Sequence, residues 1–269
     1  MNEEKKLLPK LRFPEFCDAA NWDAKTLGNE GELLSSLTGK AGADFDAGEA
    51  RFVTYMNVFS NTFADPKALR FVDVKKGENQ NAVESGDVFF TISSETPDEV
   101  GMSSVLLNKL ENCYLNSFCA LFRFSKSKRP NPVFVGYLLR QPLVRVYFTK
   151  KAQGSTRFNL SKNAFRSLPL CIPSPSEQQK IADCLSSLDE LIAAQARKVD
   201  ALKTHKKGLM QQLFPAKAKP NRACGFLSFK APESGILGRL ATCFASSMVA
   251  PSSRKIGSRR EPPSFASRI

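Results

Sequence analysis

The stretch Ser174–Phe214, SPSEQQKIADCLSSLDELIAAQARKVDALKTHKKGLMQQLF, decides the fold and predicts one long helix. Ser174 can cap the first turn, Pro175 occupies a position where a missing N–H is harmless, and Glu177 completes a capping box. Neither Pro nor Gly interrupts the pattern from there until Gly208. At a rise of 1.5 Å per residue, such a helix is about 60 Å long.

Apolar residues recur along this helix at alternating spacings of four and three. The ten positions are Ile181, Leu185, Leu188, Ile192, Gln195, Val199, Leu202, Lys206, Leu209 and Leu213. All but Gln195 and Lys206 are apolar, and the mean spacing is that of a coiled-coil seam. A helix cannot cover such a stripe by itself, so we predict a partner helix from the same chain or another one. The alternative, an ordinary amphipathic core helix, rarely keeps a seam this long.

The rest of the chain predicts an α+β fold with three parts. Residues 1–173 form a domain with a strand-rich core, 174–215 form the long helix, and 216–269 are rich in Pro, Ser, Arg, Lys and Gly without a sustained period, which predicts disorder. Within the first part we expect an arm over 1–24 and a surface loop over 27–48. Expected strands are 51–59, 71–74, 86–93, 102–107, 114–124 and 168–172. Expected helices are one or two over 132–148, broken near Pro142, and a short one capped by Ser161.

Positive charge is concentrated in one segment of the chain. The formal net charge is +13, yet the first 111 residues carry more acidic than basic side chains. Residues 112–173 contain 11 Lys and Arg and neither Asp nor Glu. A long acid-free segment of a folded domain favours a surface that faces a polyanion. The alternative is chance clustering on a solvated face that the acidic first segment partly neutralises.

Cysteine usage and hydropathy indicate a reducing cytoplasm. Seven cysteines are present, and no two of them form a C-x-x-C pair, so neither a disulfide framework nor a zinc knot is expected. No secretory signal is visible in MNEEKKLLPK, and no apolar run reaches membrane-spanning length.

Few residues suggest catalysis. The only histidine, His205, lies inside the heptad pattern, and Gly39-Lys40 lacks the other residues of a phosphate-binding loop. Asp73-Val74-Lys75, with Asp65 upstream, has the acid-x-Lys spacing of many metal-dependent nucleases, a pattern that also arises by chance. We therefore expect no catalytic residue, no metal ligand and no cofactor bound by this chain, and we keep a small metal-dependent nuclease as the enzymatic alternative.

Polar residues suited to DNA are grouped in three places. The richest group is Lys151, Gln153, Gly154, Ser155, Thr156, Arg157, Asn159, Ser161 and Lys162; weaker candidates are Ser93, Ser94 and Glu95 at a strand end, and Asn116 and Ser117 inside an apolar strand. Arg can pair with guanine, Gln or Asn with adenine, Glu with the cytosine amine, and hydroxyls with phosphate. The alternative reading of the first group is a polar turn with a capping serine.

Several motifs, in the same order along about residues 8–215, resemble a specificity subunit of a type I restriction–modification enzyme. PKLRFPEF with Trp22 resembles the opening of such subunits. FVTYMNVFSN, GDVFFTISSETPDEVGMSSV, YLNSFCALFRF and AQGSTRFNLSK resemble one class of their target-recognition domain. IPSPSEQQKIADCLSSLDELI and LKTHKKGLMQQLF resemble the start and end of the family's helical spacer.

The resemblance implies a non-catalytic subunit that reads double-stranded DNA. In the family, two recognition domains alternate with two helical regions, and each domain reads one half of a split site. Modification subunits dock on the helices, bind S-adenosylmethionine and methylate adenine, and restriction subunits cut DNA with ATP and Mg²⁺. This chain matches only the first half of that plan, which suggests a homodimer or a pair with another specificity subunit. A helical assembly protein that does not read DNA, and an inactive gene, stay open as alternatives.

Overall fold

The computed structural model describes residues 9–214, so residues 1–8 of the predicted arm, Pro215 and the predicted tail 216–269 lie outside the described residues. The described residues up to His205 belong to one compact unit, and a second begins at Lys206. No helix in the described part of the chain is long and apolar enough to cross a membrane.

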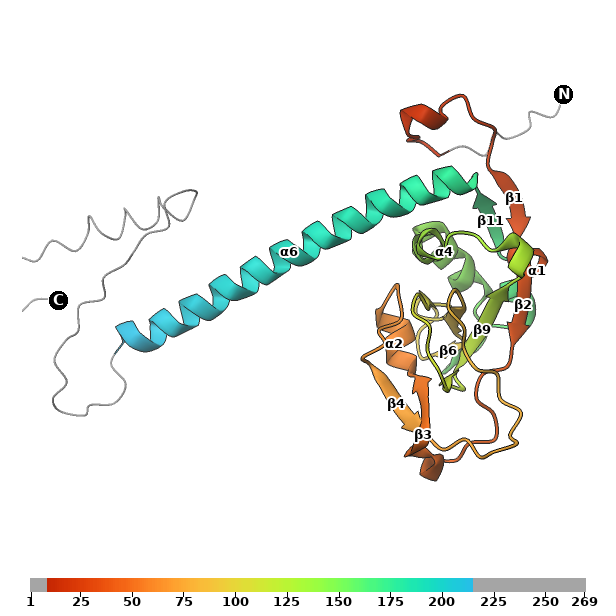
Figure 1. Cartoon of the computed structure of the whole chain (residues 1–269), viewed down its shortest axis with the longest axis horizontal. Coiled ribbons are helices and arrows are strands. Elements are labelled where there is room, and N and C mark those ends of the chain that lie inside the picture. Colours follow the sequence, from red (N-terminus) through yellow and green to blue (C-terminus); the bar gives the residue numbers. More distant parts are fainter. Residues whose placement is uncertain (1–8, 215–269) are drawn as a thin grey trace, which may run out of the picture. The chain divides into compact units, whose positions relative to one another are not determined.

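Helices and strands do not alternate regularly along the chain (Figure 1), and all strand pairs but β3-β8 are antiparallel, as in an α+β fold. In chain order they are η1 (Pro14–Phe16), β1 (Asp23–Thr26), α1 (Leu27–Glu30), β2 (Gly31–Leu34), η2 (Gly42–Asp44), β3 (Phe45–Val53), α2 (Tyr55–Ser60), β4 (Leu69–Val72), β5 (Val88–Thr91), β6 (Ser93–Ser94), β7 (Ser103–Val105), β8 (Cys113–Leu115), β9 (Cys119–Phe124), η3 (Lys126–Lys128), α3 (Pro132–Arg140), α4 (Pro142–Lys151), β10 (Phe158–Asn159), α5 (Lys162–Arg166), β11 (Pro169–Ile172) and α6 (Pro175–Leu213). The predicted α+β class is confirmed.

A four-stranded antiparallel sheet, ordered β2-β9-β5-β7, lies at the centre of the domain. Its central strand β5 is buried at every position, because both faces are covered. Phe90 and Phe122 pack with α3, α4 and α5, whereas Phe89 and Leu121 pack with Val58 of α2. A second sheet, β4-β3-β8, pairs β3 with β8 in parallel. The pairs β1-β11 and β10-β6 complete the strands.

The predicted strand 51–59 is wrong in its second half. β3 ends at Val53, and α2 begins after Thr54, whose hydroxyl accepts a hydrogen bond from the Asn57 backbone N–H at 3.2 Å. The Asn57 side chain is buried and donates to the carbonyl oxygens of Asp65 and Ala68. This cap and this buried amide outweigh the strand preference of the β-branched and aromatic residues nearby.

Two other predictions need correction. The expected loop 27–48 contains α1, β2, η2 and the start of β3. The expected strand 114–124 is two strands, β8 and β9, separated by a turn in which the Asn116 side chain accepts from the Phe118 backbone N–H at 2.9 Å. The break between α3 and α4 at Pro142, the Ser161 cap of α5 and the last strand β11 are confirmed.

The predicted long helix is confirmed as α6, which runs without interruption (Figure 1). Ser174 accepts from the Glu177 backbone N–H at 3.4 Å, but the Glu177 carboxylate does not return to the cap. It accepts instead from both Nε and Nη2 of Arg12, at 2.8 and 2.7 Å, and from Nε1 of Trp22 at 3.2 Å. The Glu177 side chain is 2% exposed and that of Arg12 is 8% exposed. The first turn of α6 thus holds the N-terminal arm.

Further contacts join the start of α6 to α3. The Asn131 backbone N–H donates to the Gln178 side chain at 2.8 Å, and the Asn131 side-chain amide donates to the Gln179 side chain at 2.7 Å. Further along both helices, the Tyr137 hydroxyl of α3 donates to Asp189 of α6 at 2.8 Å. Most of the apolar seam is open in the described part of the helix: Leu188, Ile192, Val199, Leu202 and Leu213 are exposed, whereas Ile181, Leu185 and Leu209 are half-buried.

We expect the Glu177–Arg12 pair to make stability depend on pH. Hydrogen bonding to Arg12 lowers the pKa of Glu177 below its ordinary value of 4.5. The pair therefore adds its full contribution to the free energy of unfolding above pH 4.5. This contribution is lost as the pH falls through the lowered pKa of Glu177. Glu177→Gln should lower the thermal unfolding midpoint at pH 7, and the gap to wild type should narrow below pH 4.5. Glu190→Gln, an exposed carboxylate on the same helix, is the matched control. A gap that stays constant down to pH 3 would contradict this account.

Candidate nucleic-acid interface

A tight hairpin carries the richest group of predicted DNA-binding residues. Gln153 and Asn159 exchange both backbone hydrogen bonds, at 3.0 and 2.8 Å, so residues 154–157 form the tip. Gly154 has φ +140°, and a Cβ there would lie 2.0 Å from the Arg157 carbonyl oxygen. Only glycine fits this position. The tip residues Ser155, Thr156 and Arg157 are exposed.

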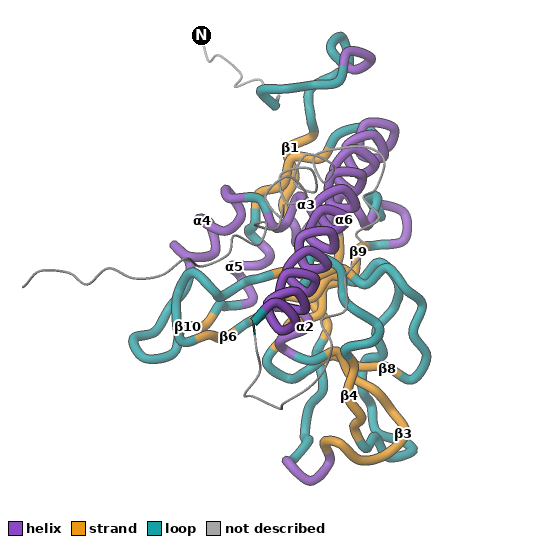
Figure 2. The backbone as a smooth tube through the Cα atoms, turned by 90° about the vertical axis from the view of Figure 1, so that its left-hand side faces the viewer, coloured by secondary structure: helices purple, strands orange, loops and turns teal. Residues whose placement is uncertain are grey.

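The second predicted group lies beside the hairpin. β10 pairs with β6, with Phe158 opposite Ser94 and Asn159 opposite Ser93, and Figure 2 shows these short strands side by side. Ser93 and Ser94 are buried, whereas Glu95, the next residue, is exposed. Strand pairing thus joins two segments separated by about sixty residues in the sequence.

The third predicted group adjoins the other two through Phe118. The Phe118 carbonyl oxygen accepts from the Ile92 backbone N–H at 3.1 Å, which places the 116–118 turn against the strand end. The Arg157 guanidinium lies over the Phe118 ring, 5.8 Å from its centroid. Asn116 and Ser117 lie in this turn rather than inside a strand; the Asn116 amide oxygen is used within the turn, and Ser117 is exposed.

Sequence reasoning missed the contribution of α2, because Tyr55–Phe59 was assigned to a strand. The Tyr55 hydroxyl donates to the Ser93 carbonyl oxygen at 3.0 Å, and the Tyr55 and Phe59 rings stack with centroids 6.2 Å apart. Met56, between them, is exposed. The available signal was Thr54, a residue type that commonly caps helices, directly before this apolar group.

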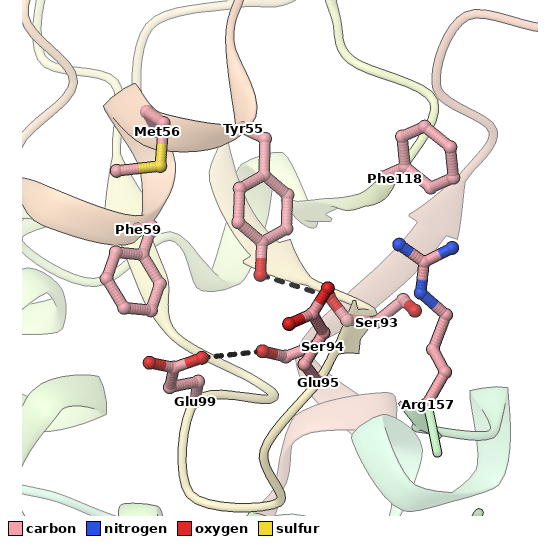
Figure 3. A pocket seen from close by; sticks show the side chains of 9 residues that line it. All are labelled: Tyr55, Met56, Phe59, Ser93, Ser94, Glu95, Glu99, Phe118 and Arg157. Carbon is pink, nitrogen blue, oxygen red and sulfur yellow. Dashed lines mark hydrogen bonds between the residues drawn. The ribbon is translucent and has the colours of Figure 1, made fainter.

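These segments enclose a pocket of about 430 Å³ (Figure 3). Its lining residues are Tyr55, Met56, Phe59, Ser93, Ser94, Glu95, Glu99, Phe118 and Arg157. Aromatic rings and a thioether form two of its sides, while a guanidinium, two carboxylates and two serines supply polar groups. Burial raises the pKa of Tyr55, so this hydroxyl keeps its proton and acts as a donor.

Two arginines hold the walls of the pocket. Arg140, on α3, donates to the carbonyl oxygens of Val58, Phe59 and Asn61 at the end of α2, and to that of Ser103. Arg145, on α4, donates to the carbonyl oxygens of Asp98 and Val100, both at 2.6 Å. Burial lowers the pKa of Arg140 to about 10, with a smaller effect from the charge of Arg145, so the Arg140 guanidinium stays charged at neutral pH. Burial also lowers the pKa of Arg145.

The acid-free segment is only partly a surface feature. Arg123 forms salt bridges with Asp87 and Glu84, and Arg129 donates to the Ser85 carbonyl oxygen. Arg140 and Arg145 donate to backbone carbonyl oxygens inside the domain. The exposed cations of the segment include Lys126 and Arg129 and, in the hairpin or close to it along the sequence, Lys150, Lys151, Arg157, Lys162 and Arg166. The Ser161 hydroxyl caps α5, because it accepts a hydrogen bond from the Ala164 backbone N–H at 3.2 Å. The exposed cations of the acid-free segment are therefore densest over residues 150–166, and a surface that faces a polyanion stays a prediction.

Residues 26–204 match the family model of the type I restriction modification DNA specificity domain. The chain belongs to this family. The match covers both the domain with the pocket and most of α6, so the helix is part of the family unit. Because the family is defined by DNA specificity, the metal-dependent nuclease alternative is not favoured. In the described residues, no three His, Cys, Asp or Glu side chains group as metal ligands would.

Individual relatives cover only part of this chain and are longer than it. A type I restriction enzyme specificity subunit of Methanocaldococcus jannaschii is 29% identical over 168 residues, or 60% of this chain and 38% of the relative. A solved chain of a type I restriction–modification system has a TM-score of 0.52 at 17% identity, over 76% of this chain and 46% of that one. The S subunit from M. genitalium has a TM-score of 0.49 at 16% identity, over 77% and 48%. The chain thus spans less than half the length of each of these relatives. The likeness with a TM-score of 0.52 supports the fold alone.

The DNA specificity domain should depend on the conformation of its hairpin tip. We expect Gly154→Ala to reduce DNA binding by roughly tenfold or more, because the added Cβ would displace the Arg157 carbonyl and with it the tip. Gly42→Ala, where a Cβ meets no atom within 4 Å, is the control and should bind as wild type does. Fluorescence anisotropy with labelled duplex measures both. Wild-type affinity in Gly154→Ala would show that the tip does not touch DNA.

Proposed function

We propose that this protein is the DNA-recognition subunit of a type I restriction–modification system and that its domain reads one half of a bipartite site. The observation that carries this proposal is the convergence of three predicted segments on one pocket, to which they contribute Ser93, Ser94 and Glu95, then Phe118, and then Arg157. The chain itself would supply recognition, and its partners would supply chemistry.

This surface would make two kinds of contact with DNA, one to phosphates and one to base edges. Lys150, Lys151, Lys162 and Arg166 are exposed and suited to phosphates, which would supply affinity without sequence choice. Gln153, Ser155, Thr156, Arg157 and Asn159 lie in or beside the hairpin tip, which would present them to base edges in the major groove. The loop 93–101, beside the tip, would enter the same groove.

The long helix would serve pairing and docking. The open seam of α6 favours a second helix packed along it, from another copy of this chain or from a longer specificity subunit. An antiparallel homodimer would present two identical pockets and read a split palindrome. Modification subunits would dock on the paired helices, followed by the restriction subunit, and these partners would carry S-adenosylmethionine, ATP and Mg²⁺. The five cysteines of the described residues are all free, which supports the cytoplasm as the site of action.

Arg157 is expected to choose a base. Arg157→Ala should cost about 1–3 kcal/mol on the preferred sequence and much less on unrelated DNA, because a bidentate contact to guanine is lost. Competition binding with specific and random duplexes measures the difference. Lys162→Ala, an exposed cation at the start of α5, is the control and should weaken both duplexes alike. Equal losses for Arg157→Ala on both duplexes would assign it to a phosphate, and an unchanged affinity would remove it from the interface.

The open seam should drive self-association. Ile192→Asp combined with Leu202→Asp should convert a dimer to a monomer, because each places a carboxylate in the apolar seam. Ala193→Asp, exposed but off the seam, is the control. Mass measurement of the full chain by analytical ultracentrifugation, alone and with the modification subunit, reports the change. A wild-type chain that stays monomeric under both conditions would exclude pairing through α6.

Selection from a random DNA pool separates this proposal from a helical assembly protein. Enrichment of a sequence supports recognition. Binding to the modification subunit without any enrichment would favour assembly alone.

A further inference from the structure

The pocket contains a carboxylate that is oriented before any ligand arrives. The Ser94 hydroxyl donates to Oε2 of Glu99 at 2.7 Å, and Ser94 is itself buried. The backbone that carries Glu99 is also held: its carbonyl oxygen accepts from the Thr91 hydroxyl at 3.2 Å, and the carbonyls of Asp98 and Val100, on either side, accept from Arg145. Figure 3 shows Glu99 facing Ser94 along one side of the pocket.

A second polar group of the pocket, the Ser93 hydroxyl, has no hydrogen-bond partner in the described structure. Ser93 is 9% exposed, and its hydroxyl is buried without a hydrogen-bond partner in the described structure. Buried hydroxyls usually find partners, so an unpaired one in the lining of a pocket indicates a place where a ligand atom fits. The acidic side of the pocket therefore combines an oriented carboxylate with an unpaired hydroxyl, and is more than a pair of nearby carboxylates.

The walls of the pocket expose large apolar side chains. Met56 is 60% exposed and Phe118 is 53% exposed, although both are large apolar side chains that folding normally buries. Phe118 lies under the Arg157 guanidinium, and Tyr55 is stacked on Phe59. These apolar groups flank the oriented carboxylate, which can face the major-groove edge of a base that stays stacked in the duplex.

The charge of Glu99 selects among the bases. An ionised carboxylate only accepts hydrogen bonds. In the major groove, cytosine and adenine present amino donors, whereas guanine and thymine present carbonyl oxygens at the corresponding positions. A carboxylate therefore attracts the first two bases and repels the other two.

We propose that Glu99 is a specificity-determining residue that accepts a hydrogen bond from the exocyclic amino group of one cytosine or adenine of the half-site. The inference rests on the proposed function and deepens it, because it names a base chemistry that the hairpin alone does not define. Glu99 rather than Glu95 carries the role, since Glu95 is exposed and no contact of the described structure orients its carboxylate. Ser94 is the positioning residue for Glu99.

The first experiment compares DNA selections. The full wild-type chain with its modification subunit, and the Glu99→Gln form, each bind a random duplex pool, and the retained DNA is sequenced. Wild type should show one position limited to cytosine or adenine. Glu99→Gln should lose roughly tenfold in discrimination at that position alone, because an amide both donates and accepts. Glu111→Gln, an exposed carboxylate that does not line the pocket, should select as wild type does.

The second experiment removes the amino group from the DNA instead of the carboxylate from the protein. The selected base is replaced by its analogue without that group, 2-pyrimidinone for cytosine or purine for adenine. Wild type should lose roughly tenfold in affinity, whereas Glu99→Gln should lose clearly less, because an uncharged amide oxygen accepts a weaker hydrogen bond from the amino group than a carboxylate does. Ser94→Ala should fall between the two, because the carboxylate remains but is no longer oriented. Thermal unfolding of each variant verifies that it is folded.

The outcomes separate the inference from the function on which it rests. If wild type enriches no sequence, the proposed function fails. If wild type enriches a sequence and Glu99→Gln enriches the same one with equal discrimination, Glu99 is not a specificity residue, and the proposed function stands. A position limited to cytosine or adenine in wild type and relaxed in Glu99→Gln supports both.

Discussion

One half-buried guanidinium, that of Arg140, connects the central sheet to the surface that would read DNA. Helix α2 is short, and the carbonyl groups at its C-terminal end lack partners within the helix. Arg140 supplies donors to the carbonyls of Val58, Phe59 and Asn61 at 2.9, 3.0 and 2.8 Å, and reaches Ser103 of β7 at 2.7 Å. Four carbonyl dipoles thus solvate the charge in place of water. Because α2 carries three of the nine pocket residues, the shape of the pocket depends on this arginine.

The same helix α3 also links the pocket to the start of α6. Asn131 caps α3 through its side-chain oxygen and binds Gln178 and Gln179 of α6 with its backbone and side-chain N–H groups. Arg140 lies at the other end of α3. A continuous set of hydrogen bonds therefore runs from the first turn of α6 to the wall of the pocket. In a subunit that reads one half of a split site, this connection would relate the reading surface of each domain to the helix that sets the spacing.

Charge counting along the sequence does not separate cations on the surface from cations that hold the fold. The acid-free segment 112–173 contains cations that fold the domain and cations that face solvent, and the sequence pattern does not distinguish them. Arg123 turned out to neutralise carboxylates from the acidic first segment, as the solvated-face alternative anticipated in part. Arg140 and Arg145 bind main-chain oxygens, a use that no local pattern reveals, because their partners lie 37 to 82 residues away.

Local pattern was enough for the long helix, its start at Ser174, the break at Pro142 and the Ser161 cap, because each depends on neighbours within a few residues. It was also enough to nominate Arg157, Gln153 and the 93–95 segment, since polar residues at a glycine turn and at a strand end are visible in one dimension. The pocket required tertiary structure. β6 meets β10 across about sixty residues, Phe118 meets Arg157 by ring contact, and α2 exists because one threonine cap and one buried amide outweigh a strand-like sequence. Such choices depend on which partners a chain can reach once it is folded, and spacing along the sequence does not carry that information.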